Sequence, residues 1–252
     1  MKTIMKALLF TCALIGAGSG HAHVAELETP RIGWATTIDH FQIDSDNFIG
    51  QRLSVDCPEW AAADDAAVIY GTDLYSSDSS ICISAKHAGV ITETGGHATL
   101  QLMPSPEAYQ SLVQNGVSSQ SRPATDRAIA FVKASDGGLD AVRDEYAPRI
   151  DWNTKFTRTG LANRDLVGQH FTFHCPKAPA DMRARRVVGT DRYAFDSMIC
   201  RAAVHAGQLS LSGGPVTLRM EPGVNDLIGS KRNGIETKNG SSVVRTVTFV
   251  EH

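Results

Sequence analysis

Short runs in which apolar and polar residues alternate recur along this chain, and each run predicts a half-buried strand. The clearest covers residues 169–174, where Phe171 and Phe173 stand two positions apart, and a similar run covers residues 52–56. A Cys-Pro pair follows each run and ends the strand, because proline donates no hydrogen bond to a sheet. Further strands are expected at residues 98–102, 127–132, 216–220 and 243–250.

A different spacing predicts one helix between the strands of each half. Ile81, Ala85 and Ala88 fall on one face at positions i, i+4 and i+7, and Gly89 supplies a left-handed end. The face is small, so a sheet can approach it closely. Residues 198–206 repeat the pattern. The side chains expected to cap the two helix starts are Asp78 or Ser79 and Asp196 or Ser197.

The two halves of the chain are copies of each other at an offset of 118 residues, since residues 30–132 align without a gap on residues 148–250. This period is far longer than the roughly 20–50 residues of a solenoid repeat, so each copy is domain-sized. We predict a first domain at 30–132, a linker at 133–147 that could hold a short helix, and a second domain at 148–252. Positions kept in both copies include Cys57/Cys175, Gly71/Gly189, Tyr75/Tyr193, Cys82/Cys200, His87/His205 and Gly96/Gly214.

Residues 1–22 have the features of a signal peptide. Lys2 and Lys6 form a positive start, residues 7–17 are apolar but too few to span a bilayer, and Gly20-His21-Ala22 is a small-x-small cleavage site. We expect cleavage after Ala22 and a product that is secreted or periplasmic. No later stretch is apolar enough to predict a transmembrane segment.

Export to an oxidising compartment favours disulfide formation by the four cysteines that remain after cleavage. Four cysteines allow three connectivities, and the duplication selects the one in which each copy has its own pair. We predict Cys57–Cys82 and Cys175–Cys200. Each closes a loop of about 25 residues, worth about 3 kcal/mol in the chain-entropy model. A zinc site is disfavoured, because there is no Cys-x-x-Cys pair.

The formal net charge of −3 hides an asymmetry between the copies. Residues 30–132 contain 5 Lys and Arg against 12 Asp and Glu, whereas residues 148–252 contain 15 against 9. The first copy is therefore acidic and the second basic. Three explanations stay open, namely drift on solvated faces, attraction between the two domains, and an anionic ligand on the second copy.

One long motif occurs in both copies and carries a resemblance to a known family. It reads Gly-Thr-Asp-x-Tyr-x-x-Asp-Ser-x-Ile-Cys-x-x-Ala-x-His-Ala-Gly from Gly71 to Gly89, and it recurs from Gly189 to Gly207. Gly-Gly and Asn-Gly pairs follow at the same distances in both copies. The pattern resembles the LCCL domain. The motif residues with acidic or imidazole side chains that could carry chemistry include Asp78, His87, Asp196 and His205.

The resemblance implies an α+β fold, in which each of two tandem domains has a central helix wrapped by antiparallel sheets. It also implies an extracellular binding module without an established enzymatic activity, for which lipopolysaccharide, carbohydrate and protein ligands have been suggested. The Cys-Pro-x-x-Cys of animal members is absent, since Trp60 and Ala61 follow Cys57-Pro58. One of the family's two bridges is therefore missing, and this two-cysteine form is more similar to bacterial members.

The candidate catalytic residues favour a structural interpretation. His87 and His205 stand near the ends of their helices and are expected to be part-buried and hydrogen-bonded, with a general base or metal ligand as the alternative. Ser79 precedes His87 by eight residues, or about 12 Å along one helix, which is too far for a nucleophile and its base. Tyr75 and Tyr193 are interpreted as core residues, with a ligand groove as the alternative. We expect no catalytic residue, cofactor or metal.

The best candidate for ligand contact is a group of arginines in the loop that differs most between the copies. The first copy lacks them, so the fold does not require them. The guanidinium group suits phosphate or carboxylate by its forked geometry. These residues are Arg183, Arg185 and Arg186, and Asp65, Ala67 and Val68 stand in their places in the first copy.

We therefore predict an exported, non-enzymatic binding protein whose ligand is an envelope polysaccharide, lipopolysaccharide or another protein. The first alternative is a structural spacer or interaction module, in which the opposite charges of the two copies hold a rigid pair. The second alternative is an uncharacterised hydrolase. We expect no nucleic-acid partner.

Overall fold

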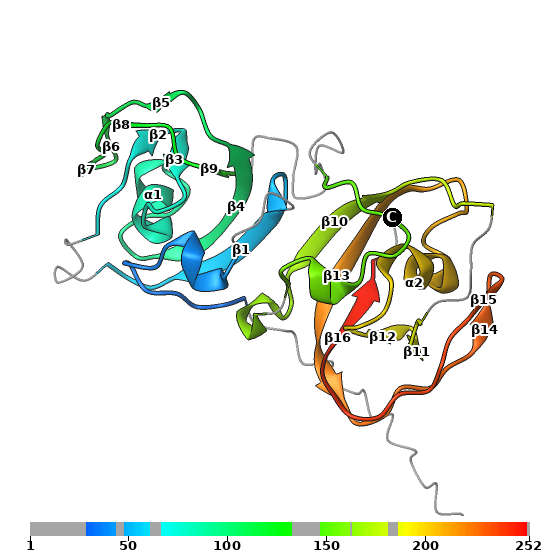
Figure 1. Cartoon of the computed structure of the whole chain (residues 1–252). Helices are drawn as coiled ribbons and strands as arrows, with labels where there is room; N and C mark the ends of the chain where they lie inside the picture. The colour runs from blue at the N-terminus through cyan, green and yellow to red at the C-terminus, as the bar shows by residue number, and fades with distance from the viewer. Residues whose placement is uncertain are drawn as a thin grey trace, which may run out of the picture.

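Two units of the same architecture make up the computed structural model of the chain (Figure 1). The predicted signal peptide, almost the whole linker, Arg183 and Arg185 lie outside the residues that the structure describes. The described residues are 29–43, 48–60, 67–132, 147–161, 163–180 and 186–250.

Each unit is built on a five-stranded antiparallel sheet whose strand order is the same in both copies. The registers also correspond, since Cys57 pairs with Gly96 and Cys175 pairs with Gly214. The order in the first unit is β1 (Arg52–Cys57), β4 (Gly96–Pro104), β9 (Arg127–Phe131), β3 (Leu74–Ser76) and β2 (Gly71–Thr72). The order in the second unit is β10 (His170–Cys175), β13 (Gly214–Val224), β16 (Val243–Phe249), β12 (Arg192–Ala194) and β11 (Gly189–Thr190).

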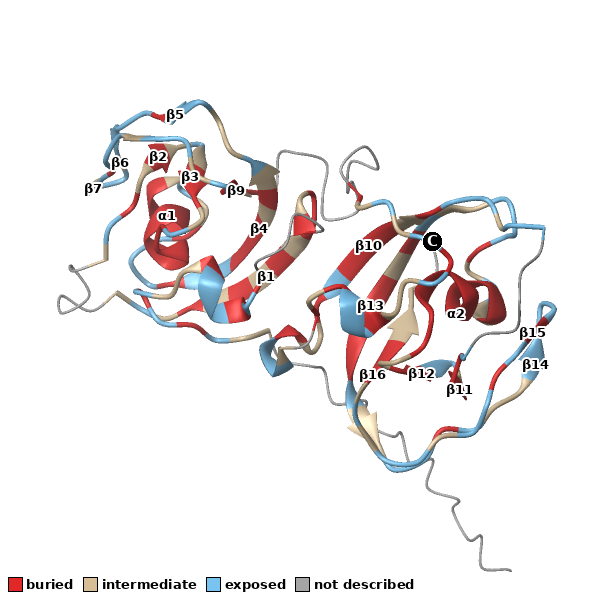
Figure 2. Cartoon of the chain, in the orientation of Figure 1, coloured by how far each residue is buried: buried red, intermediate tan, exposed pale blue. Residues whose placement is uncertain are grey.

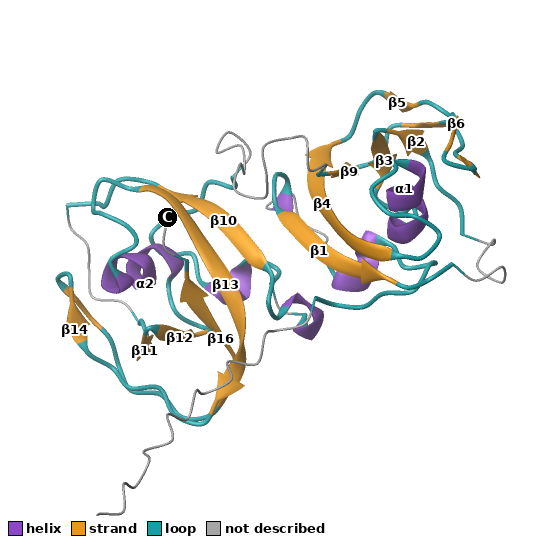
Figure 3. Ribbon diagram, turned by 180° about the vertical axis from the view of Figure 1, so that it is seen from behind, coloured by secondary structure: helices purple, strands orange, loops and turns teal. Residues whose placement is uncertain are grey.

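One α-helix lies in the curve of each sheet (Figure 3). These helices are α1 (Ile81–His87) and α2 (Ile199–Ala206). The combination confirms the predicted α+β class. The smaller strands are β5 (Ala108–Tyr109) paired with β8 (Arg122–Pro123), β6 (Val113–Gln114) with β7 (Val117–Ser118), and β14 (Lys231–Arg232) with β15 (Ile235–Glu236). The 3-10 helices are Ile38–Phe41, Phe156–Arg158 and Arg164–Leu166.

The core of each unit lies between helix and sheet. Strand β1 buries Leu53, Val55 and Cys57 and leaves the alternate residues half-buried, as the alternating pattern predicts. Every residue of α1 is buried, as Figure 2 shows. A helix that is enclosed on all sides belongs to the core. Its last polar side chain, His87, must therefore find its hydrogen-bond partners inside the unit.

The helix starts differ from the prediction. Ser80 is the N-cap of α1, and its hydroxyl accepts a hydrogen bond from the amide of Ile83 at 3.3 Å. The hydroxyl of Ser79 instead accepts from the amide of Tyr70 at 3.0 Å. In α2 the N-cap is Met198, which makes no side-chain cap hydrogen bond. The predicted caps, Asp78 or Ser79 and Asp196 or Ser197, are therefore wrong.

The helix ends agree with the prediction and gain a second contact. Gly89 and Gly207 both have positive φ, of 74° and 83°, which favours glycine. The Asn-Gly turns that close the two short hairpins also reach the helices. Asn115 donates from its side chain to the carbonyl of His87 at 2.9 Å, and Asn233 donates to the last carbonyls of α2 at 3.0 and 3.2 Å. Each hairpin thus caps the helix in its own unit.

The cysteines pair within each copy, as predicted. The disulfides are Cys57–Cys82 and Cys175–Cys200, and each spans 25 residues. In each unit the bridge joins the end of the first long strand to the first turn of the helix. It therefore fastens the two main elements of the unit together.

The two units meet through a reciprocal set of hydrogen bonds. The side-chain amide of Gln51 accepts from the amide of Thr172 at 2.9 Å and donates to the carbonyl of the same residue. The side-chain amide of Gln169 pairs with Ser54 in the same way. It accepts from the amide of Ser54 at 2.8 Å and donates to the carbonyl of Ser54 at 2.9 Å. Gln169 is the counterpart of Gln51, and Thr172 is the counterpart of Ser54, at the offset of 118. The contact therefore has an approximate twofold symmetry, and both glutamines are buried in it.

Aromatic packing and one ion pair flank these hydrogen bonds. Phe48 and Phe171 pack edge to face with ring centroids 6.2 Å apart. Phe48 also lies so close to Gly160 that a Cβ atom there would come within 2.7 Å of the ring. His40 and Asp165 form an ion pair at 3.2 Å, with both side chains about half exposed. Among the described residues, amide hydrogen bonds and apolar packing therefore contribute more to this contact than charge does.

Candidate functional site

A buried tyrosine–histidine pair lies at the centre of each unit. The hydroxyl of Tyr75 lies 2.7 Å from Nδ1 of His87, and that of Tyr193 lies 2.8 Å from Nδ1 of His205. All four side chains have no exposed surface. The histidines are thus hydrogen-bonded, as the structural interpretation predicted, and they are fully buried where that interpretation expected partial burial. The tyrosines expose no surface to a ligand, which favours the core interpretation over a ligand groove.

The titration behaviour of these groups follows from their burial. Burial raises the pKa of Tyr75, and it raises the pKa of Tyr193 to about 12. Burial also lowers the pKa of His205, while a hydrogen bond with Ser230 acts in the opposite direction. The phenols and the second histidine are therefore neutral near pH 7, which suits a hydrogen-bonded core pair.

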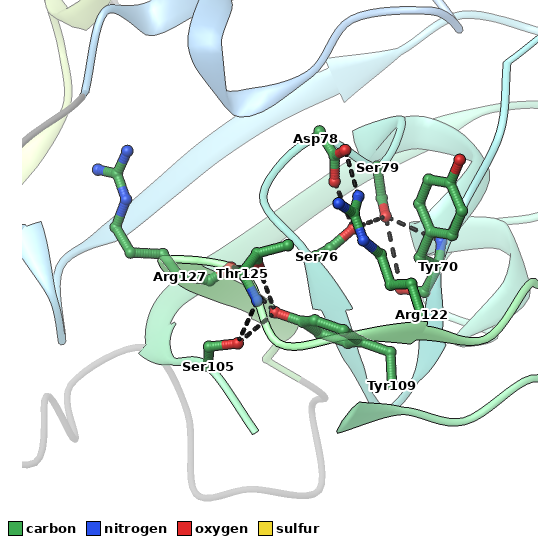
Figure 4. A network of polar contacts seen from close by, with 9 residues as sticks. All are labelled: Tyr70, Ser76, Asp78, Ser79, Ser105, Tyr109, Arg122, Thr125 and Arg127. Atoms are coloured by element: carbon green, nitrogen blue, oxygen red, sulfur yellow. Dashed lines mark hydrogen bonds and ion pairs between the residues drawn. The ribbon is translucent and has the colours of Figure 1, made fainter. Parts of the chain in front are cut away.

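Asp78 lies in a polar network at the start of α1 (Figure 4). It accepts a hydrogen bond from the hydroxyl of Ser76 at 2.5 Å and forms an ion pair with Arg122, whose guanidinium also lies 4.7 Å from the ring centroid of Tyr70. Burial raises the pKa of Asp78, but the hydrogen bonds and the charge of Arg122 outweigh it and hold that pKa below its ordinary value. The ionised carboxylate of Asp78 therefore holds Arg122 of β8 near the start of α1.

Ser79 and His87 belong to separate networks. The hydroxyl of Ser79 contacts the hydroxyl of Ser76 at 3.0 Å as well as the amide of Tyr70. The ring nitrogens of His87 contact Tyr75 and, at 3.0 Å, the carbonyl of Leu112. The serine therefore does not contact the imidazole, and the two do not form the nucleophile and base of a hydrolase.

A second cluster in Figure 4 was missed by the sequence analysis. The hydroxyl of Tyr109 contacts Ser105 at 3.0 Å and Thr125 at 2.8 Å, and it donates to the carbonyl of Arg127 at 3.0 Å. Leu227 stands at the place of Tyr109 in the second unit. The fold therefore does not require this cluster, whose members come from loops and short strands without a marked pattern.

The second unit holds its equivalent of Asp78 with a different arginine. Asp196 pairs with Nε of Arg186 at 2.9 Å, and the side chain of Arg186 remains 60% exposed. The position of Arg122 is taken by Gly240 in this unit. One of the three candidate arginines therefore has a structural partner and still exposes more than half of its side chain to solvent.

An apolar groove in the second unit was also missed by the sequence analysis. It has a volume of about 560 Å³ and is lined by Lys177, Ala178, Pro179, Ala180, Leu211 and Ser212. Leu211 is 51% exposed. The signal was present in the sequence, because Trp60 in the first copy is replaced by Ala178 in the second.

Other kinds of site find little support among the described residues. No three His, Cys, Asp or Glu side chains within the described ranges gather closely enough to hold a metal ion. Nor do those ranges contain a helix with the length and apolar character needed to cross a membrane.

Comparison with known proteins finds the same family twice in the chain. The family model described as "LCCL domain" matches residues 32–129 and again residues 150–246. The human protein "Cysteine-rich secretory protein LCCL domain-containing 2" is 30% identical over 176 residues, which are 69% of this chain and 33% of that protein. "Clotting factor C" of Tachypleus tridentatus is 40% identical over 85 residues, or 34% of this chain and 8% of that protein.

A third relative is "Cochlin" of Bos taurus, which is 33% identical over 91 residues, or 36% of this chain and 16% of that protein. This chain spans about a third or less of the length of these relatives. The similarity therefore concerns the duplicated unit, and the rest of each relative has no counterpart in the aligned residues.

Proposed function

The chain belongs to the LCCL domain family, of which it carries two copies, and we propose that it is an exported binding protein without catalytic activity. Members of this family serve as binding and interaction modules. Export is inferred from the charged, apolar and small residues of positions 1–22. The chemistry of the ligand and the place where it binds are inferred from the differences between the two copies.

The observation that carries the proposal is the burial of the tyrosines and histidines of the motif that the two copies share. Its tyrosines and histidines have no exposed surface, and their polar atoms are bonded to one another or to nearby loops. Residues that both copies keep thus maintain the fold. Recognition is then left to residues that differ between the copies, and the arginine loop is one such segment.

The second copy has the charge for an anionic ligand. It carries 15 Lys and Arg against 9 Asp and Glu, and three of these cations lie close together in the sequence of its variable loop. Arg186 presents a 60% exposed side chain beside its contact with Asp196. We assign to Arg183, Arg185 and Arg186 the binding of an anionic envelope polymer, such as lipopolysaccharide or an acidic polysaccharide.

A spacer is the second candidate function, and the contact between the units favours it. The two pairs of hydrogen bonds made by the side chains of Gln51 and Gln169 would hold the two units in one orientation. A spacer of this kind needs no ligand of its own.

Retention on immobilised lipopolysaccharide tests the anion site in the mature chain. The variant Arg183→Ala/Arg185→Ala/Arg186→Ala is expected to lose at least about tenfold in affinity, since each charge-assisted hydrogen bond contributes about 1.5–3 kcal/mol. The matched control, Arg158→Ala/Lys231→Ala/Lys238→Ala, removes the same charge from exposed positions of the same unit and should retain most of the binding. Equal retention by both variants would exclude the arginine loop, and no retention by the wild type would favour the spacer.

A further inference from the structure

One arginine of the second unit faces the core side of its sheet. Arg245 stands two residues before Val247 in β16, so the two side chains share a face, and Val247 has no exposed surface. Cζ of Arg245 lies 5.1 Å from the ring centroid of Phe195. That ring stacks on Phe156 with centroids 6.2 Å apart. Arg245 therefore lies at the edge of the core, with an aromatic ring against its guanidinium.

The counterpart of Arg245 in the first unit has a partner that Arg245 lacks. A guanidinium nitrogen of Arg127 donates to the carbonyl of Ile43, and Arg127 is only 8% exposed. In the second unit Nη1 of Arg245 is enclosed by the protein and has no hydrogen-bond partner among the described residues. A buried donor without a partner is destabilising, so the second unit keeps this arginine at a cost to its fold.

The backbone brings a second arginine to this edge. Gly168, four residues after Arg164, donates from its amide to the carbonyl of Met220 in β13 at 2.8 Å. Arg245 pairs with Pro222, two residues further along the same strand. Burial lowers the pKa of Arg245, and the positive charge of Arg164 lowers it further.

The two arginines are cations without an acidic partner. Within the described ranges neither takes part in an ion pair. Arg219 also has a buried Nε without a hydrogen bond, but that atom lies 3.7 Å from the carboxylate of Glu221. The positive charge of Arg164 and Arg245 is therefore left uncompensated by the chain itself.

Arg164 is held at its position by contacts on either side of it. It begins the 3-10 helix at 164–166, and the side chain of the N-cap Asn163 accepts from the amide of Asp165 at 3.0 Å. The same side chain donates to the carbonyl of His40 in the first unit at 3.0 Å. The backbone that carries this cation is therefore fixed before any ligand arrives.

The first copy lacks the features that make this edge cationic. Asp46 stands at the place of Arg164, and Ser77 stands at the place of Phe195. The second copy thus has a second positive charge and an aromatic ring where the first has an acid and a small polar residue. The fold does not require these differences, since both copies have the same strand order.

We propose that the guanidinium groups of Arg164 and Arg245 bind one phosphate group, either as the free ion or as a monoester on the anionic polymer. Arg245 is part-exposed and Arg164 is exposed, so a small anion has access to both. A phosphate monoester carries a charge of about −1.5 to −2 near pH 7, which matches two guanidinium groups, whereas one carboxylate matches a single group. Its oxygens also suit the forked hydrogen bonds of arginine. The site does not include the arginine loop and does not rest on anion binding there.

Amide NMR spectra of the mature chain, titrated with inorganic phosphate at constant ionic strength, test the proposal. Phosphate should shift the signals of Arg164, Phe195 and Arg245 in a saturable way. Acetate, with its single charge, should bind at least about tenfold more weakly. The Arg183→Ala/Arg185→Ala/Arg186→Ala variant should bind phosphate like the wild type, so failure of this site and failure of the arginine loop are distinguishable.

Arg164→Asp gives the second unit the residue of the first copy and makes the test specific. It should weaken phosphate binding at least about tenfold. It should also raise the free energy of unfolding in phosphate-free buffer, because an acid replaces a like charge beside Arg245, so lost binding would not reflect misfolding. Lys231→Asp makes the same charge change at an exposed position of β14 and should alter phosphate affinity by less than about twofold. Unchanged affinity in Arg164→Asp, equal loss in both variants, or no saturable shift in the wild type would overturn the proposal.

Retention on immobilised lipopolysaccharide identifies the source of the phosphate, and this arm alone rests on the function proposed above. Weaker retention of Arg164→Asp, together with lost phosphate binding, identifies a phosphate group carried by the polymer. Retention like that of the wild type, with phosphate binding lost, identifies the free ion. Both results support the site.

Discussion

At the scale of single residues, the tautomer of the first motif histidine follows from its partners. The carbonyl of Leu112 can only accept a hydrogen bond, so Nε2 of His87 donates to it, and in the tautomer with its proton on Nε2 the ring accepts at Nδ1 from the hydroxyl of Tyr75. In the second unit the hydroxyl of Ser230 replaces that carbonyl, at 3.2 Å from Nε2 of His205. The same core pair is thus completed by backbone in one copy and by a side chain in the other.

The burial of His205 predicts a loss of stability in mild acid. Burial lowers its pKa in the folded protein, so the unfolded chain takes up the proton first as the pH falls below about 6.5. The free energy of unfolding should therefore fall between about pH 6.5 and the lower pKa of the folded state. Urea unfolding of the wild type and of His205→Gln at several pH values measures this, and the variant should show a weaker dependence.

The exposed residue His97 provides the control for this measurement. Its side chain is 50% exposed, so His97→Gln removes an imidazole from the surface and leaves the buried pair in place. The assignment to His205 fails if the two variants have the same dependence.

At the scale of elements, the sequence predicts what local patterns encode. The alternating runs locate the long strands, and the spacing of Ile81, Ala85 and Ala88 locates α1. The predicted caps are wrong because α1 begins one residue later, at the cap Ser80, and no side chain caps α2, while the first amide of each helix also pairs with a residue far away in the sequence. The amide of Ile81 donates to the carbonyl of Thr36 at 2.9 Å, and the amide of Ile199 donates to that of Thr154 at 3.0 Å. Such partners leave no local signal.

The same limit applies to the candidate sites. The duplication separated the shared motif from the variable arginine loop, but it did not show that the tyrosines and histidines of the motif have no exposed surface. The groove became visible only when Ala178 and Leu211 were found close together in space. Neither residue belongs to a sequence motif, and the sequence shows only that they replace Trp60 and Glu93 at the offset of 118 residues.

Removal of one disulfide should destabilise one unit more than the other. Cys57→Ala/Cys82→Ala opens a loop of 25 residues in the first unit, and the expected cost is about 3 kcal/mol. Hydrogen–deuterium exchange followed by mass spectrometry resolves the two units in the intact chain. Exchange should accelerate in α1 and β1, with a smaller change in α2 and β10.

The matched variant, Cys175→Ala/Cys200→Ala, should reverse this pattern, because the second bridge spans the same number of residues. If either variant accelerated exchange equally in both units, the bridges would not act within separate folding units.

At the scale of the whole molecule, the contact between the units shows why opposite charges are a poor guide to docking. The sequence asymmetry favoured electrostatic attraction as one explanation, but the described contact is built around Gln51 and Gln169. A glutamine side chain carries an NH2 donor and a carbonyl acceptor side by side, so it can pair with both the carbonyl and the amide of a strand residue. The use of equivalent residues on both sides gives a contact like that of a symmetric dimer joined into one chain.

Loss of the hydrogen bonds made by the two glutamine side chains should separate the units without unfolding them. Gln51→Ala/Gln169→Ala removes four hydrogen bonds and leaves the amides and carbonyls of Ser54 and Thr172 without these partners. Each bond contributes about 1 kcal/mol, so the docked arrangement should lose several kcal/mol. Small-angle X-ray scattering should show a larger radius of gyration for the variant, while its circular dichroism spectrum stays that of the wild type.

His40→Ala removes the half-exposed ion pair with Asp165 and should leave the radius of gyration unchanged, as should high salt on the wild type. Expansion of the wild type in high salt, together with unchanged dimensions of the glutamine variant, would instead place the docking energy in the opposite charges of the two units.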